Sequence, residues 1–220
     1  MDEAAAVDFI KRNTLLLAPP LTPEISLHLA AESLPIWQKT EEELGEMNVP
    51  PPYWAFAWAG GQALARYLLD NPTVVTGRRV LDLGSGSGLV AIAAALAGAS
   101  AVTAFDIDAL AIAAIKLNAS ANGVALDASV DDPLAGAVPD SAVIVVGDLF
   151  YERELADRVL RFIDAAARAD CSILVGDPKR SYFPVDRFLA VATYEVPVTR
   201  ELEDNEIKRT TVWRLAKASA

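Results

Sequence analysis

Residues 79–90 read RVLDLGSGSGLV, a short apolar run that stops in a loop of alternating glycines. The first five residues predict a buried strand, and the Ala-rich residues 88–99 predict a helix directly after the loop. Gly84, Gly86 and Gly88 lack side chains, so backbone N–H groups of the loop can approach a ligand. A strand, a glycine-rich turn and a helix in this order predict the ligand crevice of a doubly wound α/β fold.

The spacing of the glycines narrows the kind of ligand. A dinucleotide-binding fingerprint reads G-x-G-x-x-G/A, but the third residue after Gly86 is Leu89, which is too bulky for close packing of helix on strand. The glycines run G-x-G-x-G instead, and the acidic Asp82 precedes them. This form suits a ligand without a pyrophosphate, whose amino-acid or sugar part lies over the loop. The alternative is an ordinary strand–turn–helix whose glycines serve only tight packing.

The rest of the chain continues the alternation of short apolar runs and helical stretches. Further strands are predicted at residues 101–107, 125–130 (weak), 142–147 and 171–177, and helices at 108–123 and 152–169. Continuous apolar strands between helices predict a mostly parallel sheet covered on both faces. Two strand-like runs, residues 191–201 and 206–216, are joined by the polar LEDN and predict an antiparallel hairpin at the end of that sheet.

Length and composition bound the domain organisation. A chain of 220 residues, 53% hydrophobic and 22% charged, is expected to form one globular domain. Residues 1–75, rich in Trp and Pro, are interpreted as an N-terminal cap with a lead-in helix at 61–71, and residues 76–220 as the cofactor-binding α/β core. No apolar run reaches the ~18 residues of a membrane span, so no membrane partner is expected.

The charge and the residue inventory argue against several functions. A net charge of −11 and a pI near 4.5 disfavour a nucleic-acid partner; the surface either steers a basic partner or only keeps the protein soluble. His28, the only histidine, is interpreted as a surface or helix-face residue, which disfavours a serine–histidine–aspartate triad and a His–Cys zinc site. No metal is predicted. The single Cys171 forms no internal disulfide, which suits a reducing cytoplasm.

Acidic residues follow the second and third predicted strands. Asp106 ends the second strand, where its carboxylate can accept hydrogen bonds from both hydroxyls of a ribose, whereas Asp108 suits the N-cap of the next helix. Asp131 and Asp132 follow the weak third strand. Either of them accepts a hydrogen bond from an adenine amino group, or both belong to an ordinary Asp-Pro turn.

The stretch VIVVGDLFYE, residues 143–152, leads a carboxylate directly out of a buried strand. Asp148 follows five residues suited to the core, and Phe150 and Tyr151 stand beside it. An ordinary strand-to-helix connection would offer Gly, Ser or Asn here. This ending therefore predicts a functional site at the edge of the sheet.

Residues 80–123 resemble the class I, seven-β-strand S-adenosylmethionine-dependent methyltransferases. More narrowly, the chain resembles the electron transfer flavoprotein β-subunit lysine methyltransferases in four segments: LTPEISLHL (21–29), PPYWAFAWAGGQALARYLLDNP (51–72), GDLFYE (147–152) and IKRTTVWRL (207–215). The resemblance covers nearly the whole chain. The glycine motif is shared by a very large superfamily, whereas the Trp-rich segment and GDLFYE are much narrower.

The resemblance implies a Rossmann-like seven-stranded sheet of order 3-2-1-4-5-7-6, with the seventh strand antiparallel. It implies S-adenosyl-L-methionine as cofactor and S-adenosyl-L-homocysteine as product. The predicted cofactor-binding residues are Trp58, Gly60, Asp82, Gly84, Gly86, Gly88, Asp106, Ile107, Asp131 and Asp148. Asp82 and the loop glycines are implied to surround the methionine part, Asp106 to hold the ribose, and Trp58, Gly60 and Gly61 to lead into the pocket.

Asp148 and Tyr151 match the family's D-x-x-Y signature, which implies that they are catalytic and lie beside the transferable methyl group. A lysine amine, whose free pKa is near 10.4, must lose its proton before it attacks in line. Asp148 is predicted to position it, with action as a general base as the alternative. Trp54, Phe150 and Tyr151 are predicted to line a channel for the lysine stem, although the Trp54 ring also fits core packing.

The predicted function is methylation of protein lysines, with the electron transfer flavoprotein β-subunit as substrate and partner. The alternatives are methylation of a ribosomal protein or of a small amine of the nicotinamide type, and a cofactor-binding module that regulates a partner without catalysis. The animal enzymes carry mitochondrial targeting sequences, whereas this chain starts almost directly at DFIKRNT, residues 8–14, which implies a cytoplasmic bacterial counterpart. Lys179 and Arg180, after the fifth strand, are interpreted as solvent-facing. The target lysines, the number of methyl groups and the oligomeric state stay open.

Overall fold

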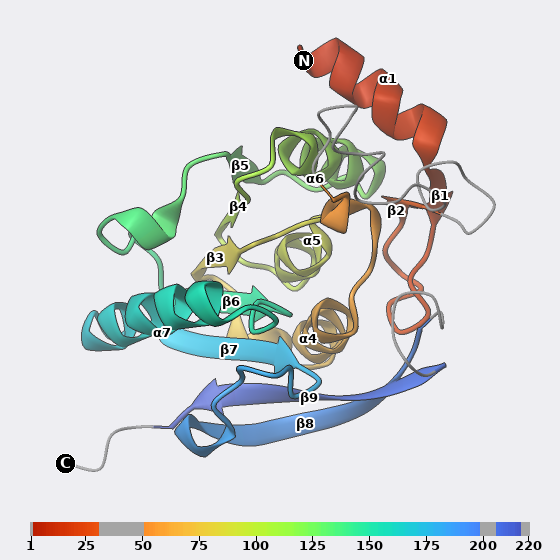
Figure 1. The fold of residues 1–220 in the computed structure, drawn as a ribbon. Helices are drawn as coiled ribbons and strands as arrows, with labels where there is room; N and C mark the ends of the chain where they lie inside the picture. Colours follow the sequence, from red (N-terminus) through yellow and green to blue (C-terminus); the bar gives the residue numbers. More distant parts are fainter. Residues whose placement is uncertain (1, 31–50, 199–205, 217–220) are drawn as a thin grey trace.

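The computed structural model describes residues 2–30, 51–198 and 206–216. Seven strands form one sheet in the order β5-β4-β3-β6-β7-β9-β8 (Figure 1). They are β3 (Arg79–Leu83), β4 (Ala101–Phe105), β5 (Asp127–Ser129), β6 (Val143–Gly147), β7 (Ser172–Asp177), β8 (Phe188–Pro197) and β9 (Ile207–Leu215). Numbered from the first strand of this sheet, the order is 3-2-1-4-5-7-6, so the predicted fold class and strand order are confirmed.

Five of these strands are parallel, and the last two form a hairpin. β3 pairs in parallel with β4 and β6, β4 with β5, and β6 with β7. β9 runs antiparallel to both β7 and β8. The predicted antiparallel hairpin is therefore confirmed, while its polar connection LEDN lies outside the described residues.

Helices cover both faces of the sheet, which explains why its central strands read as continuous apolar runs. The α-helices are α1 (Glu3–Asn13), α4 (Ala59–Asp70), α5 (Leu89–Leu96), α6 (Ala109–Ala121) and α7 (Arg153–Arg168). In β6, Val143 and Val145 join the apolar cluster of α4 and α5, whereas Ile144 and Val146 join that of α7. Figure 1 shows α7 on one face of the sheet and α4 and α5 on the other.

The segment before the sheet packs on α5, on α6 and on the sheet itself. The Oδ1 atom of Asp2 accepts a hydrogen bond from the backbone N–H of Ala5 and so caps α1, which lies against α6. β1 (Leu15–Leu17) pairs antiparallel with β2 (Leu27–Leu29). His28 lies in β2, half-buried and hydrogen-bonded to Thr14, so the expected helix-face placement is wrong. The predicted lead-in helix is α4, which packs on β7 and β9.

Short turns of 3-10 helix complete the described chain: η1 (Tyr53–Ala55), η2 (Pro72–Val74), η3 (Pro133–Ala135) and η4 (Val185–Arg187). Of these, η1 packs against α6 and η3 against α7, and both contribute residues to a cavity at the carboxyl ends of the parallel strands. No helix in the described parts of the chain combines the length and the apolar composition that crossing a membrane requires.

Candidate active site

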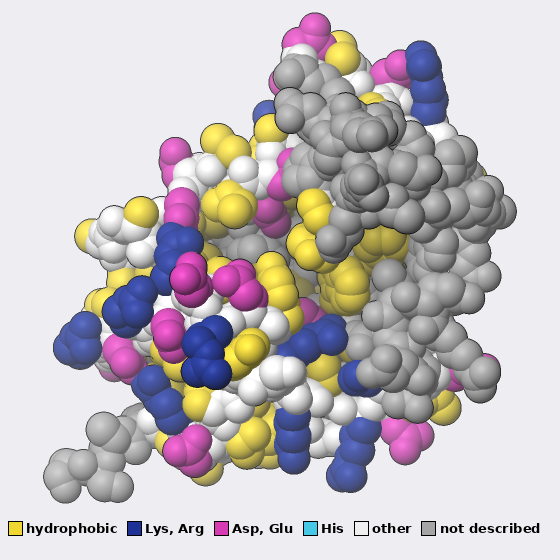
Figure 2. All heavy atoms as spheres, in the orientation of Figure 1, with side chains coloured by type: hydrophobic (Ala, Val, Ile, Leu, Met, Phe, Trp, Pro, Cys, Tyr) yellow, Lys and Arg dark blue, Asp and Glu magenta, His cyan; other side chains and the backbone are white. Residues whose placement is uncertain are grey.

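A cavity of about 470 Å³ lies at the carboxyl ends of β3, β4 and β6, where a doubly wound sheet holds its ligands. Figure 2 shows a hollow among apolar side chains near the middle of the visible face, with basic and acidic side chains mixed over α7 beside it. The predicted site residues that line the cavity are Trp54, Trp58, Gly84, Gly86, Asp106, Ile107, Asp131, Asp148 and Tyr151. Gly60, Asp82, Gly88 and Phe150 lie outside its lining.

The glycine loop after β3 has the left-handed backbone that its sequence requires. Gly84, Gly86 and Gly88 have φ angles of 63°, 55° and 83°, which side chains rarely adopt. A Cβ on Gly84 would lie 2.7 Å from the side chain of Leu149, and one on Gly88 would lie 3.3 Å from the Cα of Ile115. Gly88 therefore serves close packing of the loop on α6 and does not line the cavity.

Asp82 holds the loop in place from behind. Its Oδ2 atom accepts hydrogen bonds from the Ser85 hydroxyl at 2.6 Å and from the backbone N–H of Ala91 at 3.1 Å. The side chain is buried, and this burial raises its pKa to about 7. Asp82 thus ties the loop to α5 and lies behind the cavity wall, whereas the resemblance implied a place around the methionine part of the ligand.

Asp106 joins the two loops that meet at the cavity. Its Oδ2 atom accepts a hydrogen bond from the N–H of Gly86 at 2.8 Å, and its Oδ1 atom accepts one from the N–H of Asp108 at 3.0 Å. Burial raises the pKa of Asp106. Ile107 stands at the rim with 74% of its surface exposed. Asp108 caps α6 through the N–H of Leu110, so its predicted role as N-cap is confirmed.

The two aspartates after β5 differ in how far their carboxylates are engaged. Asp132 accepts a hydrogen bond from the N–H of Leu134 through Oδ1 and forms an ion pair with Arg158 through Oδ2. Asp131 is exposed and accepts one side-chain bond, from the Ser129 hydroxyl, at Oδ2. Of the two, Asp131 has the more accessible oxygen toward the cavity, and Asp132 fits the Asp-Pro turn.

Asp148, which follows directly after β6, is an engaged carboxylate. Its Oδ1 atom accepts hydrogen bonds from Nε and Nη2 of Arg180 at 3.0 and 2.7 Å, and its Oδ2 atom accepts one from the N–H of Gly61 at 3.1 Å. The backbone of Asp148 has φ of 55°, a conformation that costs energy for a residue other than glycine. Arg180 is mostly buried beside it, which contradicts the solvent-facing interpretation.

Aromatic rings form one wall of the cavity. The ring of Tyr53 lies 6.1 Å from that of Trp58 and 6.0 Å from that of Tyr151, between centroids. The indole N–H of Trp58 donates to the carbonyl of Tyr53 at 2.9 Å, which fixes the pair. Trp54 is buried in the core against α6, yet it lines the cavity, and its Nε1 has no partner among the described residues. Trp54 therefore belongs both to the core and to the cavity lining, as the two interpretations of it proposed.

Phe150 does not line a channel, and the prediction that it does is wrong. Its ring is fully buried on the α7 face of the sheet and packs edge-on against Phe183, with centroids 5.1 Å apart. The left-handed backbone at Asp148 turns the chain, so Phe150 points into the core while Tyr151 faces outward with 47% exposure. Of these two neighbouring residues, only Tyr151 meets the cavity.

Sequence reasoning missed Tyr53, Leu149 and Arg180 as parts of the site. Tyr53 lies in the Trp-rich segment, residues 51–72, on which the family resemblance partly rests. The aromatic residues of that segment, taken together, were the sequence feature that could have identified it. Arg180 follows Asp177 at the carboxyl end of β7, next to β6 in the sheet. Adjacent parallel strands end at the same edge of a sheet, so the position of Arg180 just after β7 could have indicated that it lies near Asp148.

The lining suits a cationic ligand with a ribose and an adenine better than a phosphate-bearing one. Five aspartates line the cavity against two arginines, and each arginine is already paired with an aspartate. The Asp106 carboxylate lines the cavity and can also accept hydrogen bonds from a diol, and Ile107, Pro133 and Leu134 offer apolar contact for a flat base. Trp54, another lining residue, carries a buried indole N–H that has no partner among the described residues. These features fit S-adenosyl-L-methionine, whose sulfonium carries a positive charge.

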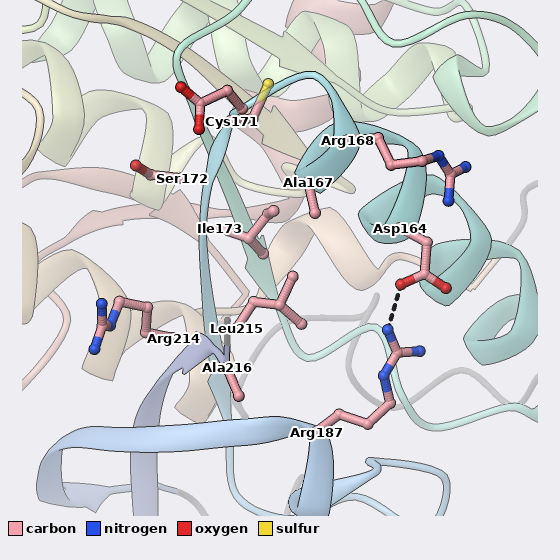
Figure 3. A pocket seen from close by; sticks show the side chains of 11 residues that line it. Asp164, Ala167, Arg168, Cys171, Ser172, Ile173, Arg187, Arg214, Leu215 and Ala216 are labelled. Carbon is pink, nitrogen blue, oxygen red and sulfur yellow. Dashed lines mark hydrogen bonds and ion pairs between the residues drawn. The ribbon is translucent and has the colours of Figure 1, made fainter. Parts of the chain in front are cut away.

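A second cavity, of about 790 Å³, lies at the opposite edge of the sheet (Figure 3). It sits where β7 begins and β9 ends, and Arg187 is ion-paired to Asp164 across it. It has neither a glycine loop nor a strand-ending carboxylate of β3, β4 or β6, so it does not share the chemistry of the first cavity. No group of His, Cys, Asp or Glu that could hold a metal ion occurs among the described residues.

Comparisons with known proteins identify methyltransferases as relatives of this chain. The family model of the ribosomal protein L11 methyltransferases, PrmA, matches residues 62–172. The chain is 41% identical to the electron transfer flavoprotein beta subunit lysine methyltransferase of Danio rerio, over 94% of this chain and 82% of that protein. It is 37% identical to the Homo sapiens protein of the same name, over 93% of this chain and 80% of that protein.

Solved structures show the same fold. The magnesium protoporphyrin IX methyltransferase of Synechocystis, solved with S-adenosylmethionine bound, superposes with a TM-score of 0.53 at 19% identity, over 71% of this chain and 80% of that one. At that identity the likeness concerns the fold alone. The predicted methyltransferase activity and its S-adenosylmethionine cofactor are confirmed by the relatives, and the chain belongs to the family of the electron transfer flavoprotein β-subunit lysine methyltransferases.

Proposed function

We propose that this enzyme methylates lysine side chains of the electron transfer flavoprotein β-subunit. One observation carries the proposal: Asp148 and Tyr151, the D-x-x-Y pair at the end of β6, open into the same cavity as the glycine loop and Asp106. A methyl acceptor that reaches this pair therefore stands next to the expected place of the methyl donor. The relatives of known name, at 37–41% identity over more than nine-tenths of the chain, give the lysine and the protein substrate.

The cofactor supplies an activated methyl group on its sulfonium. The chain's own part is to hold that group and to line up the acceptor, because an in-line displacement gains most from alignment and exclusion of water. Asp106 binds at the ribose, the Gly84–Gly86 turn brings backbone close to the amino-acid part, and Ile107 covers the base. Asp131, with its accessible carboxylate oxygen, meets the adenine amino group.

The aromatic wall of Tyr53, Trp58 and Tyr151 receives the lysine stem. The four methylenes of the stem pack on ring faces, and a charged amine gains about 1–2 kcal/mol from them once it is desolvated. Burial, followed by Tyr53 and nearby acidic groups, raises the pKa of Tyr151. Tyr151 therefore keeps its proton at neutral pH and acts as a neutral hydrogen-bonding phenol, with no part as a base.

Asp148 acts in positioning, because both of its oxygens are already hydrogen-bonded. A carboxylate that accepts bonds from a guanidinium and from the first turn of a helix is a poor proton acceptor. It fixes Arg180 and the start of α4 around the entry of the amine. General-base action by Asp148 is the weaker of the two alternatives on this geometry.

The test is transfer of labelled methyl groups in a cell extract. Purified enzyme with radiolabelled S-adenosylmethionine should label one main protein band, and the same band should appear with purified electron transfer flavoprotein alone. Label confined to small molecules would instead support an amine of the nicotinamide type.

A second candidate substrate is ribosomal protein L11, because the L11 methyltransferase model matches residues 62–172. That match covers the cofactor half of the site and leaves out Tyr53, Trp58 and the terminal hairpin. Purified L11 run beside the flavoprotein in the same assay separates the two substrates, and labelling of L11 alone would replace the first proposal.

A further inference from the structure

The pairing of Arg180 with Asp148 sets the charge that an incoming lysine meets. The guanidinium donates from Nε and Nη2 to one oxygen of Asp148, and its Cζ lies 5.8 Å from the centroid of the Trp58 ring. Only 19% of the Arg180 side chain and 9% of the Asp148 side chain are exposed. The pair therefore forms part of the cavity wall and interacts through a poorly solvated medium, in which charges act strongly.

Arg180 is itself held in place by the loop that follows β7. Its backbone N–H donates to Oδ1 of Asp177 at 2.7 Å, and Lys179 before it has a left-handed φ of 68°. Asp177 is fully buried at the end of β7. The backbone of Arg180 is therefore anchored, and its guanidinium is held at the cavity by the two hydrogen bonds to Asp148.

A lone carboxylate in this position would oppose the reaction. The amine attacks only without its proton, and a nearby negative charge stabilises the ammonium form and raises the pKa of the lysine. The positive charge of a guanidinium beside the carboxylate cancels this effect of the negative charge on the lysine.

We propose, on the basis of the proposed lysine methylation, that Arg180 is a positioning residue that neutralises Asp148, so that the target lysine is held at the methyl group as a neutral amine. Other titratable groups face this region. They are Asp177 at the end of β7, Tyr53 before α4, Asp106 at the end of β4, and Tyr151 and Glu152 after β6. Asp177 contacts the pair through the backbone N–H of Arg180, and the charges of Asp148 and Arg180 shift its pKa in opposite directions.

The test is the pH profile of kcat at saturating protein substrate and cofactor, which reports the pKa values of the bound complex. Arg180→Gln should move the rising limb to higher pH by about one unit, because Asp148 then acts on the amine without its partner. The double variant Asp148→Asn/Arg180→Gln should return the limb to the wild-type position. Arg180→Lys keeps the charge and should leave it within a few tenths of a unit.

Lys179→Gln is the matched control. Lys179 precedes Arg180 in the sequence and carries the same charge, but its side chain lies outside the cavity lining, so the pH profile of this variant should match that of wild type. Repeating the series in Asp177→Asn protein removes the titration of that carboxyl from the comparison. Arg180→Met, which keeps the aliphatic stem beside Trp58, replaces Arg180→Gln if that variant does not fold.

Two results would overturn the inference alone: an unchanged limb in active Arg180→Gln and Arg180→Met, or a shift that persists in the double variant. A wild-type enzyme that methylates no lysine at any pH would remove the proposed function as well, which distinguishes the two failures.

Discussion

A Cβ atom on Gly60 would stand 2.4 Å from Oδ2 of Asp148 and 2.2 Å from the carbonyl oxygen of Gly176. The first turn of α4 thus presses directly onto the carboxylate at the end of β6. This contact brings the N–H of Gly61 within 3.1 Å of Oδ2 of Asp148. Gly60, predicted as a cofactor contact, instead sets how closely the helix approaches the site.

Gly60→Ala is expected to abolish or nearly abolish activity and to lower the melting temperature. The clash involves a backbone carbonyl as well as a side chain, so it cannot be relieved by rotamer changes. Gly61→Ala is the control in the same turn, because its Cβ would make ordinary contact with Val90 at 3.9 Å. That variant should be neutral or more stable by up to ~1 kcal/mol. Equal losses in both variants, by calorimetry and methyl transfer, would contradict this packing account.

Asp106→Ala is expected to weaken binding of S-adenosylhomocysteine by about ten- to a hundredfold, the cost of losing charge-assisted hydrogen bonds. Asp108→Asn removes a charge from the same cavity, but asparagine still caps α6, so its affinity should stay within about threefold. Isothermal titration calorimetry measures both. If the two variants bound the product equally well, Asp106 would not be the ribose ligand.

Asp131→Ala should mainly affect ligand binding, and Asp132→Ala should mainly affect stability. Asp131 makes only a local side-chain bond with Ser129, so its loss should weaken binding of S-adenosylhomocysteine several-fold with little change in melting temperature. Asp132 caps η3 and pairs with Arg158, so its loss should lower stability by about 1 kcal/mol. The reverse pattern in calorimetry and thermal melts would exchange the two assignments.

Asp177→Asn is expected to stabilise the protein at alkaline pH. Burial raises the pKa of Asp177 from 3.8 to about 7, so the folded state holds this proton over an interval in which the unfolded state has lost it. Stability therefore falls as pH rises from about 4 to about 7, and the full cost is present above that. Oδ2 of Asp177 is buried and has no partner among the described residues. Asparagine avoids the cost because it places a neutral amide there in place of a charged carboxylate.

The melting temperature of Asp177→Asn should exceed that of wild type by a few degrees at pH 8, which is roughly 1 kcal/mol or more for a domain of this size. The difference should shrink at pH 5. Asp157→Asn, exposed on α7, is the control and should show no such dependence. A constant difference across this range would mean that Asp177 is ionised in the folded protein.

The sheet could be predicted from the sequence because its signals are local. Continuous apolar strands, Gly84 to Gly88 and the polar break between β8 and β9 each depend on neighbouring residues, and the resemblance supplied the strand order. The boundaries shifted by up to four residues, and those of β3 did not shift. His28 was misplaced because a three-residue strand such as β2 carries no periodic pattern. The bacterial, cytoplasmic setting stays a prediction.

The site could be predicted only in part, because contacts between distant segments decide it. Asp106 and Asp148 are recognisable as strand-ending carboxylates. That Arg180 engages Asp148 depends on the order of β6 and β7 in the sheet and on the left-handed turn at Lys179. Phe150 is buried and Tyr151 faces the cavity after a positive φ at Asp148, a conformation that only a few per cent of residues other than glycine adopt and that the sequence alone does not signal.

The most direct test is mass spectrometry of purified electron transfer flavoprotein after incubation with the enzyme and S-adenosylmethionine. Methylated lysines should appear on the β-subunit, should be absent without cofactor, and should decrease at least tenfold with Asp148→Ala, which should still bind S-adenosylhomocysteine. Unmodified β-subunit lysines in the presence of enzyme that labels another acceptor would contradict the account.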